Sequence, residues 1–371
     1  MPGAAPGQPV KDGRVYGRGS ADDKSGIIMN LGALRTFTTM PPVHLKIVLE
    51  GEEEAGDSLE EYVRHNPDLF KADVLVIADT GNYELGKPTF TTSLRGLVAA
   101  DVTVRTLNSP VHSGEYGGPT PDAFMALIHL LNQVQNPAGD VVVPDLLQAA
   151  WQGHEPDEQK FREQAGVKAG VHLIGTGLLG SRLFGKPSVN VVGLDGPPTI
   201  DGSINQLTAT ATARVSLRIA PLEDPQHAFS QLKAYLEDPA FNPWNAEVQV
   251  NPVEGSAGSG FQADTTKPGY ALAEMAMLHA YPCEQVVFTG AGGSIPLVTQ
   301  LQQVNPDSTV LLIGCEEALC RIHSFPESVD ITELHKMTLA ESYLLMFLGD
   351  RKTTAEVEAM AMASKAVPGG M

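Results

Sequence analysis

Apolar, strand-like runs alternate with amphipathic, helix-like runs at both ends of the chain, and this alternation constrains the fold more than any other feature. Buried strands are expected at residues 43–49 and 73–78, and helices at residues 25–36 and 58–65. The same alternation resumes after residue 260. Its expected elements are strands at residues 285–288 and 309–313 and helices at residues 270–279, 296–302 and 331–347. Such alternation favours an α/β fold whose sheet is covered by helices on both faces.

The middle of the chain alternates apolar and polar residues, which is typical of half-exposed strands. Its expected elements are strands at residues 97–105, 208–219 and 247–250 and helices at residues 122–134 and 225–236. This pattern predicts an α+β domain inserted into the first domain, and a length of 371 residues also favours two hydrophobic cores. The expected boundaries are residues 1–91 and 254–350 for the first domain, 92–253 for the inserted one and 351–371 for a flexible tail.

Composition excludes several classes of partner. A net charge of -19 argues against nucleic acid and against an anionic membrane surface, because both repel acidic proteins. The three cysteines form neither a CxxC pair nor an even disulfide framework, which fits a reducing compartment. No apolar run is long enough to cross a bilayer, and no signal-peptide core is present. We therefore expect a cytoplasmic protein without a membrane or nucleic-acid partner.

Acidic residues and one histidine follow the expected strands. Glu53 and Glu54 come after residues 43–49, Asp79 ends the next strand, and His323 lies in the loop after residues 309–313. Ligands gather at the carboxyl ends of strands in open α/β sheets. Asp22 lies in a glycine-rich turn before a helix, where the positive helix end favours a carboxylate. Together these groups predict a site for two divalent ions, which needs several carboxylates and a nearby base.

Six motifs occur in an order that resembles a known family. They are GRGSADDK at residues 17–24, EEEAG at 52–56, the strand end at Asp79, HSG at 112–114 followed by GG at 117–118, GGSIP at 292–296, and HSFPE at 323–327. This order is similar to that of M20 metallopeptidases, nearest to the dipeptidase branch that includes carnosinases, from about residue 12 to 348. The resemblance implies a zinc-peptidase-like α/β/α sandwich catalytic domain with an inserted α+β lid and dimerisation domain.

The resemblance also implies roles for the acidic groups. Asp22 would bridge two metal ions, Asp79 would hold the first ion, and Glu54 and His323 would hold the second. Glu53 would be the general base that takes a proton from the attacking water and delivers it to the leaving amine. Zinc is the expected ion, with manganese or cobalt as alternatives because oxygen ligands outnumber nitrogen ligands.

The inserted domain carries further residues that match the family pattern. His112 resembles the histidine that such enzymes lend to the partner subunit's active site, where it would stabilise an oxyanion. Arg218 resembles the arginine that binds the substrate's terminal carboxylate, and Asn205 resembles its small polar partner. Gly293 and Ser294 would offer backbone contacts to the substrate. These matches imply a homodimer formed through the lid domain, with a small peptide or acyl-amino acid as substrate.

The chain departs from the family pattern at its start. Family members begin with a strand that ends in His-x-Asp, whose histidine binds the first metal ion, and nothing upstream of Gly17 supplies it. The sequence therefore predicts an N-terminal truncation, a weak first metal site and low activity. His44 and His65 are the nearest possible substitutes, but the pattern places them inside a strand and on a helix.

The sequence is compatible with three functions. The first is metal-dependent hydrolysis of dipeptides or short peptides, and the second is deacylation of N-acyl or N-succinyl amino acids by the same site. The third is a catalytically silent dimer that binds peptides or one metal ion. A GxGxxG match at residues 175–180 is not counted as a dinucleotide site, because Gly185 and Pro187 interrupt the helix that should follow.

Overall fold

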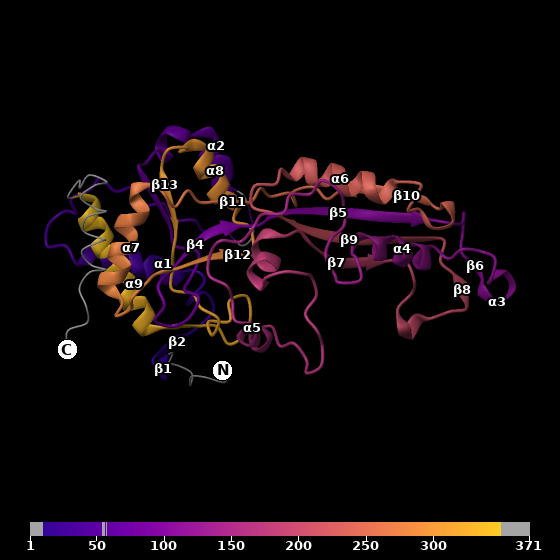
Figure 1. Cartoon of the computed structure of the whole chain (residues 1–371), viewed down its shortest axis with the longest axis horizontal. Coiled ribbons are helices and arrows are strands. Elements are labelled where there is room, and N and C mark those ends of the chain that lie inside the picture. The colour runs from indigo at the N-terminus through magenta and orange to yellow at the C-terminus, as the bar shows by residue number, and fades with distance from the viewer. Residues whose placement is uncertain (1–9, 54–55, 57, 350–371) are drawn as a thin grey trace. The chain divides into compact units, whose positions relative to one another are not determined.

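The computed structural model describes residues 10–53, 56 and 58–349, which form two compact units (Figure 1). The first unit comprises the described residues up to 92 together with 263–290 and those from 297 onward. The second unit comprises residues 93–262 and 291–296. The two stretches of the first unit that flank the second are far apart in sequence and share one core.

A mixed sheet forms the centre of the first unit. Its strand order is β11-β4-β13-β3, and β12 also pairs with β4. The strands are β3 (Val74–Ile77), β4 (Thr89–Leu94), β11 (Phe261–Gln262), β12 (Val287–Ala291) and β13 (Thr309–Leu312). Strands β3 and β13 are parallel and in register from Val74 opposite Thr309 to Ile77 opposite Leu312. Their carboxyl ends therefore meet at one edge of the sheet.

Helices cover both faces of this sheet because β3 points apolar side chains in both directions. Val74 and Val76 pack against the cluster formed with α1, α7 and α9, whereas Leu75 and Ile77 pack against α2 and α8. The helices are α1 (Lys24–Arg35), α2 (Ser58–His65), α7 (Pro268–Ala280), α8 (Pro296–Val304) and α9 (Ile331–Gly349). This arrangement is the expected α/β sandwich. Within the described residues, no helix is both long and apolar enough to cross a membrane.

A small antiparallel sheet joins the two ends of the first unit. Strand β1 (Val10–Lys11) pairs with β2 (Arg14–Tyr16), and β2 pairs with β14 (Ser328–Asp330). The pairing brings the turn that follows β2 beside the loop that precedes β14. Both segments carry residues of the candidate site.

The second unit is an antiparallel sheet with helices on one face. Its strand order is β10-β5-β9-β7. Apolar residues of β5 and β9 form one buried cluster with α4 and α6. The elements of this unit are β5 (Gly96–Arg105), β6 (Val111–His112), α3 (Ser113–Tyr116), α4 (Ala123–Leu131), α5 (Glu158–Gln164), β7 (Ser188–Asp195), β8 (Gln206–Leu207), β9 (Thr210–Ile219), α6 (Pro225–Glu237) and β10 (Glu247–Pro252).

The prediction of a buried strand at residues 43–49 is wrong. No strand is formed there, and the side chains of Leu45, Ile47, Val48 and Leu49 are exposed. An apolar run has a tendency to extend, but a strand also needs a neighbour that pairs with its backbone. In the described part of the chain, no strand pairs with this run. The expected flexible tail at residues 351–371 lies outside the described residues.

Helix α9 contains a glutamate whose burial makes stability depend on pH. Glu341 is 6% exposed, and burial raises its pKa to about 7. The folded state then binds this proton more tightly than the unfolded state does, so stability is highest below the ordinary pKa of 4.5 and falls as the pH rises through 7. We expect Glu341→Gln to raise the free energy of unfolding at pH 8 by about 2 kcal/mol and to have little effect at pH 5. Urea denaturation at both pH values measures this difference, and equal effects at the two values would contradict the assignment.

Candidate functional site

Three carboxylates converge at the carboxyl edge of the first unit's sheet. Ligand oxygens of Asp22, Asp79 and Glu316 all lie within 4.8 Å of one another, and each side chain is partly buried. Asp79 follows β3 and Glu316 follows β13, and because these strands are parallel neighbours their ends lie together. Asp22 reaches the same place from the turn between β2 and α1.

Two glycines allow the backbones behind Asp79 and Glu316 to approach closely. A Cβ atom at Gly81 would lie 1.9 Å from the carbonyl oxygen of Glu316, and one at Gly314 would lie 1.9 Å from that of Thr80. The Asn82 N–H donates to the Glu316 carbonyl oxygen at 2.6 Å. Any side chain at these positions would push the two strand ends apart.

His323 joins the carboxylates from the loop between β13 and β14. Its Nε2 lies 2.9 Å from Asp22 Oδ2. The imidazole side chain is 63% exposed, whereas that of Asp22 is 11% exposed. The backbone of His323 has a φ of +57°, a conformation that residues other than glycine rarely adopt and that is often found at functional sites.

The carboxylates strongly affect one another's ionisation. Burial and the charges of Asp79 and Asp22 raise the pKa of Glu316 to about 9. Burial also raises the pKa of Asp23 to about 7. The hydrogen bond from the Gly26 N–H lowers this pKa, whereas the charges of Asp22 and Glu53 raise it. Packed carboxylates of this kind favour a proton or a cation between them. Three carboxylates with an adjacent imidazole form a donor set that fits zinc or manganese.

The predicted site residues of the first unit have different outcomes. The structure brings Asp22 and Asp79 together and places His323 beside Asp22. Glu53 is exposed, and its charge reaches Asp23 beside the cluster. Glu54 lies outside the described residues. Glu316 was missed, although it follows a strand in the same way as Asp79 and that position was the available signal.

In the second unit, the structure brings His112 and Asn205 together. Strands β6 and β8 pair His112 with Gln206, and the Asn205 carbonyl accepts from the Ser113 N–H at 3.0 Å. His112 Nδ1 accepts from the Gly114 N–H at 3.1 Å and thereby caps the short helix α3. Arg218 lies near the far end of β9, which follows β8. Arg218 lies eight residues after Thr210, the first residue of β9, and this length of extended strand places the two residues roughly 26 Å apart.

Arg218 has a second arginine as its neighbour. Strand β9 pairs Arg218 with Leu97 of β5 and with Ser188 of β7, and Arg95 donates from Nη1 to Ser188 Oγ at 2.9 Å. Burial and the charge of Arg218 lower the pKa of Arg95 to about 10. In the described part of the chain, no carboxylate pairs with either guanidinium. Two partly buried cations without an acid are suited to an anion.

The glycine-rich segment at residues 291–296 lies against this arginine. A Cβ atom at Gly292 would be 3.2 Å from Arg95 Nη2, so glycine keeps the backbone close to the guanidinium. Gly293 has no atom within 4 Å of a Cβ position. The Ser294 Oγ would lie 3.6 Å from a Cβ atom at Gly258. The predicted substrate residues Arg218, Gly293 and Ser294 therefore belong to one region of the second unit.

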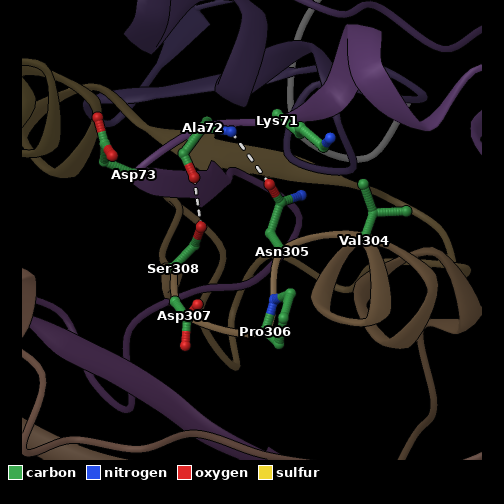
Figure 2. Close-up of a pocket in the computed structure, with 8 residues that line it drawn as sticks. All are labelled: Lys71, Ala72, Asp73, Val304, Asn305, Pro306, Asp307 and Ser308. Carbon is green, nitrogen blue, oxygen red and sulfur yellow. Dashed lines mark hydrogen bonds between the residues drawn. The ribbon is translucent and has the colours of Figure 1, made fainter.

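A surface pocket of the first unit lies away from this chemistry. Its lining is Lys71, Ala72, Asp73, Val304, Asn305, Pro306, Asp307 and Ser308 (Figure 2). Asn305 Oδ1 accepts from the Ala72 N–H at 3.0 Å, and the Ser308 hydroxyl donates to the Ala72 carbonyl (Figure 2). These groups join the turn after α8 to the segment before β3. The polar groups at the centre of the pocket are therefore occupied by hydrogen bonds that hold these two segments together.

Known proteins resemble the chain over most of its length. The pattern of peptidase family M20/M25/M40 matches residues 2–346. The Cysteinylglycine-S-conjugate dipeptidase of Corynebacterium striatum is 37% identical, and the match covers 91% of this chain and 75% of that protein. The Beta-Ala-His dipeptidase of Rattus norvegicus is 26% identical, with 81% of this chain and 64% of that protein covered.

Solved structures share the fold. The di-peptidase Dug1p of Saccharomyces cerevisiae superposes with a TM-score of 0.75 at 20% identity, covering 93% of this chain and 76% of that one. Human carnosine dipeptidase 1 gives a TM-score of 0.72 at 23% identity, with coverages of 92% and 74%. The sequence matches and the clustered carboxylates lead to the same assignment. The chain belongs to peptidase family M20/M25/M40.

Proposed function

We propose that the protein is a metal-dependent dipeptidase. The observation that carries the proposal is the convergence of Asp22, Asp79 and Glu316 with His323 beside them. The dipeptidase names of the relatives support the same class of reaction. Deacylation of acyl-amino acids and a silent, non-catalytic dimer are the alternatives that the experiment below separates.

The proposed metal ligands are the four clustered side chains. Asp22 lies within reach of every other member and suits the bridging position between two divalent ions. Zinc is the proposed ion, with manganese or cobalt as alternatives, and Glu54 remains a proposed ligand from the family pattern. When bound, such ions lower the pKa of water and polarise a carbonyl group.

Side chains of the protein itself would carry out the proton transfers and bind the substrate. We assign Glu53 as the general base, which accepts a proton from water and delivers it to the leaving amine nitrogen. Its charge acts on Asp23, so it lies within electrostatic reach of the Asp22 turn. Arg218, with Arg95 beside it, is proposed to bind the substrate's carboxylate. Asn205, Gly293 and Ser294 are the further proposed substrate contacts.

A homodimer is part of the proposal. The length of β9 separates His112 from Arg218, so within one chain the histidine cannot act beside the arginine, whereas a partner subunit's copy can. Strand β7 is an edge strand with exposed Val191, Val192 and Leu194, which suits a contact with a second copy.

A cytoplasmic location is also proposed. The three cysteines are free thiols, which supports a reducing compartment.

The test is a metal-reconstitution assay. The protein is stripped with a chelator, reloaded with zinc, manganese or cobalt, and supplied with Cys-Gly, β-Ala-His and a panel of N-acyl amino acids. We expect release of free amino acids from dipeptides only after reloading, with a rate that falls at least 100-fold on chelation. Turnover confined to N-acyl substrates would favour the deacylase. Metal uptake without turnover of any substrate would favour the silent dimer.

A further inference from the structure

Glu327 connects the turn that carries Asp22 to the loop that carries His323. Its side chain is 2% exposed, and it lies four residues after His323 and one residue before β14. Oε2 accepts from the Gly19 N–H at 2.8 Å, and Oε1 accepts from the N–H groups of Ala21 and Asp22 at 3.0 and 3.1 Å. One buried carboxylate thus binds three backbone donors of the turn, including the amide of Asp22 itself.

A backbone hydrogen bond also connects Glu327 to the turn that carries Asp22. The Gly17 N–H donates to the carbonyl of Glu327 at 3.1 Å, so both the main chain and the side chain of this residue hold the turn. Arg18 contributes little to the carboxylate, because its guanidinium is 65% exposed and lies 3.8 Å away. The buried amides are the principal partners of Glu327.

Arg14 fixes the loop on its other side. This buried arginine donates from Nε to Ser328 Oγ at 2.8 Å, and from Nη2 to Glu317 Oε1 at 2.6 Å and to the Ser328 carbonyl at 3.1 Å. Glu317 and Ser328 lie at the two ends of the loop that contains His323. Arg14 therefore holds both ends of the loop through contacts that are separate from those between Glu327 and the turn.

We propose that Glu327 is a positioning residue that sets Asp22 against His323 and so fixes the spacing of the metal ligands. The proposal rests on the proposed metal site and adds a residue that binds no ion itself. Glu327 accepts directly from the Asp22 amide, and a carboxylate binds amide donors more strongly than a neutral group does. Partners that orient metal ligands typically change metal affinity 10- to 100-fold when they are replaced.

Two substitutions separate position from charge. Glu327→Gln removes the charge and presents an amide N–H to a backbone donor, whereas Glu327→Asp keeps the charge and withdraws it by one methylene. We expect each variant to bind Mn²⁺ about 10-fold or more weakly, measured by calorimetric titration and by electron paramagnetic resonance of the bound ion. If Glu327→Asp bound as tightly as the wild type while Glu327→Gln did not, the field of the charge would explain the effect and the positioning role would be overturned.

Glu341→Gln is the matched control, because it makes the same change at a buried glutamate of α9 whose carboxylate forms no hydrogen bond with the described turn. It should keep wild-type Mn²⁺ affinity. Circular dichroism during a temperature ramp reports whether each variant is folded. If Glu327→Gln does not fold, the Mn²⁺ titration of Glu327→Asp alone tests the positioning role. A wild-type protein that bound no ion would instead refute the proposed metal site. Wild-type affinity in both Glu327 variants would refute only the positioning role.

Discussion

Replacing Asp22 by asparagine is expected to lower kcat/KM for dipeptides about 1000-fold, equivalent to about 4 kcal/mol of transition-state stabilisation. Asparagine has nearly the same shape but lacks the charge that suits a position between two cations. The variant should also retain less metal than the wild type after dialysis, and mass spectrometry measures the metal content. Since the change also relieves repulsion with Asp79 and Glu316, the metal-free variant should unfold at the same temperature as the metal-free wild type or at a higher one.

The matched control for this variant is Asp307→Asn. Asp307 is an exposed carboxylate of the same unit and lines the pocket of Figure 2. It should retain wild-type activity and metal content. An Asp22→Asn protein that kept both its metal and its activity would remove the bridging assignment.

Replacing Gly81 by alanine is expected to lower the free energy of unfolding by about 3 kcal/mol, at the upper end of the cost of overpacking. The added methyl group would meet backbone atoms of Glu316, which cannot rotate away as a side chain can. We expect the ends of β3 and β13 to separate, with loss of metal binding as well as stability. Urea denaturation and a Mn²⁺ titration measure the two effects.

Gly51→Ala serves as the control for the backbone argument. A Cβ atom at Gly51 would have no neighbour within 4 Å, and its φ is not positive. This variant should change stability by less than about 1 kcal/mol. If Gly81→Ala behaved in the same way, the close approach of the two strand ends would not be what holds the carboxylates together.

Local patterns in the sequence indicated part of the candidate site. Asp79 and His323 follow apolar strands, whose carboxyl ends are where ligands gather, but the choice of Asp79 depended mostly on the family resemblance. Glu316 follows a strand in the same way. Its approach to Asp79 depends on Gly81 and Gly314 fitting against a segment far away in the chain, and no local pattern encodes that fit.

The misplaced strand has a related cause. Residues 43–49 have the apolar character of a buried strand, but pairing depends on a neighbour that the run itself cannot specify. The same holds for β6 and β8, whose two-residue strands are too short for periodicity to reveal. Their pairing is nevertheless what brings His112 to Asn205.

The pairing of β2 with β14 has a consequence for biosynthesis. Asp22 leaves the ribosome early, but its hydrogen-bonding partner Glu327 and its neighbour His323 are translated some 300 residues later. Contacts of such long range form slowly, because a large loop must close first. The turn that carries Asp22 can therefore gain these partners only after nearly the whole chain has been translated, and a product that ends before them would lack the complete carboxylate and imidazole cluster.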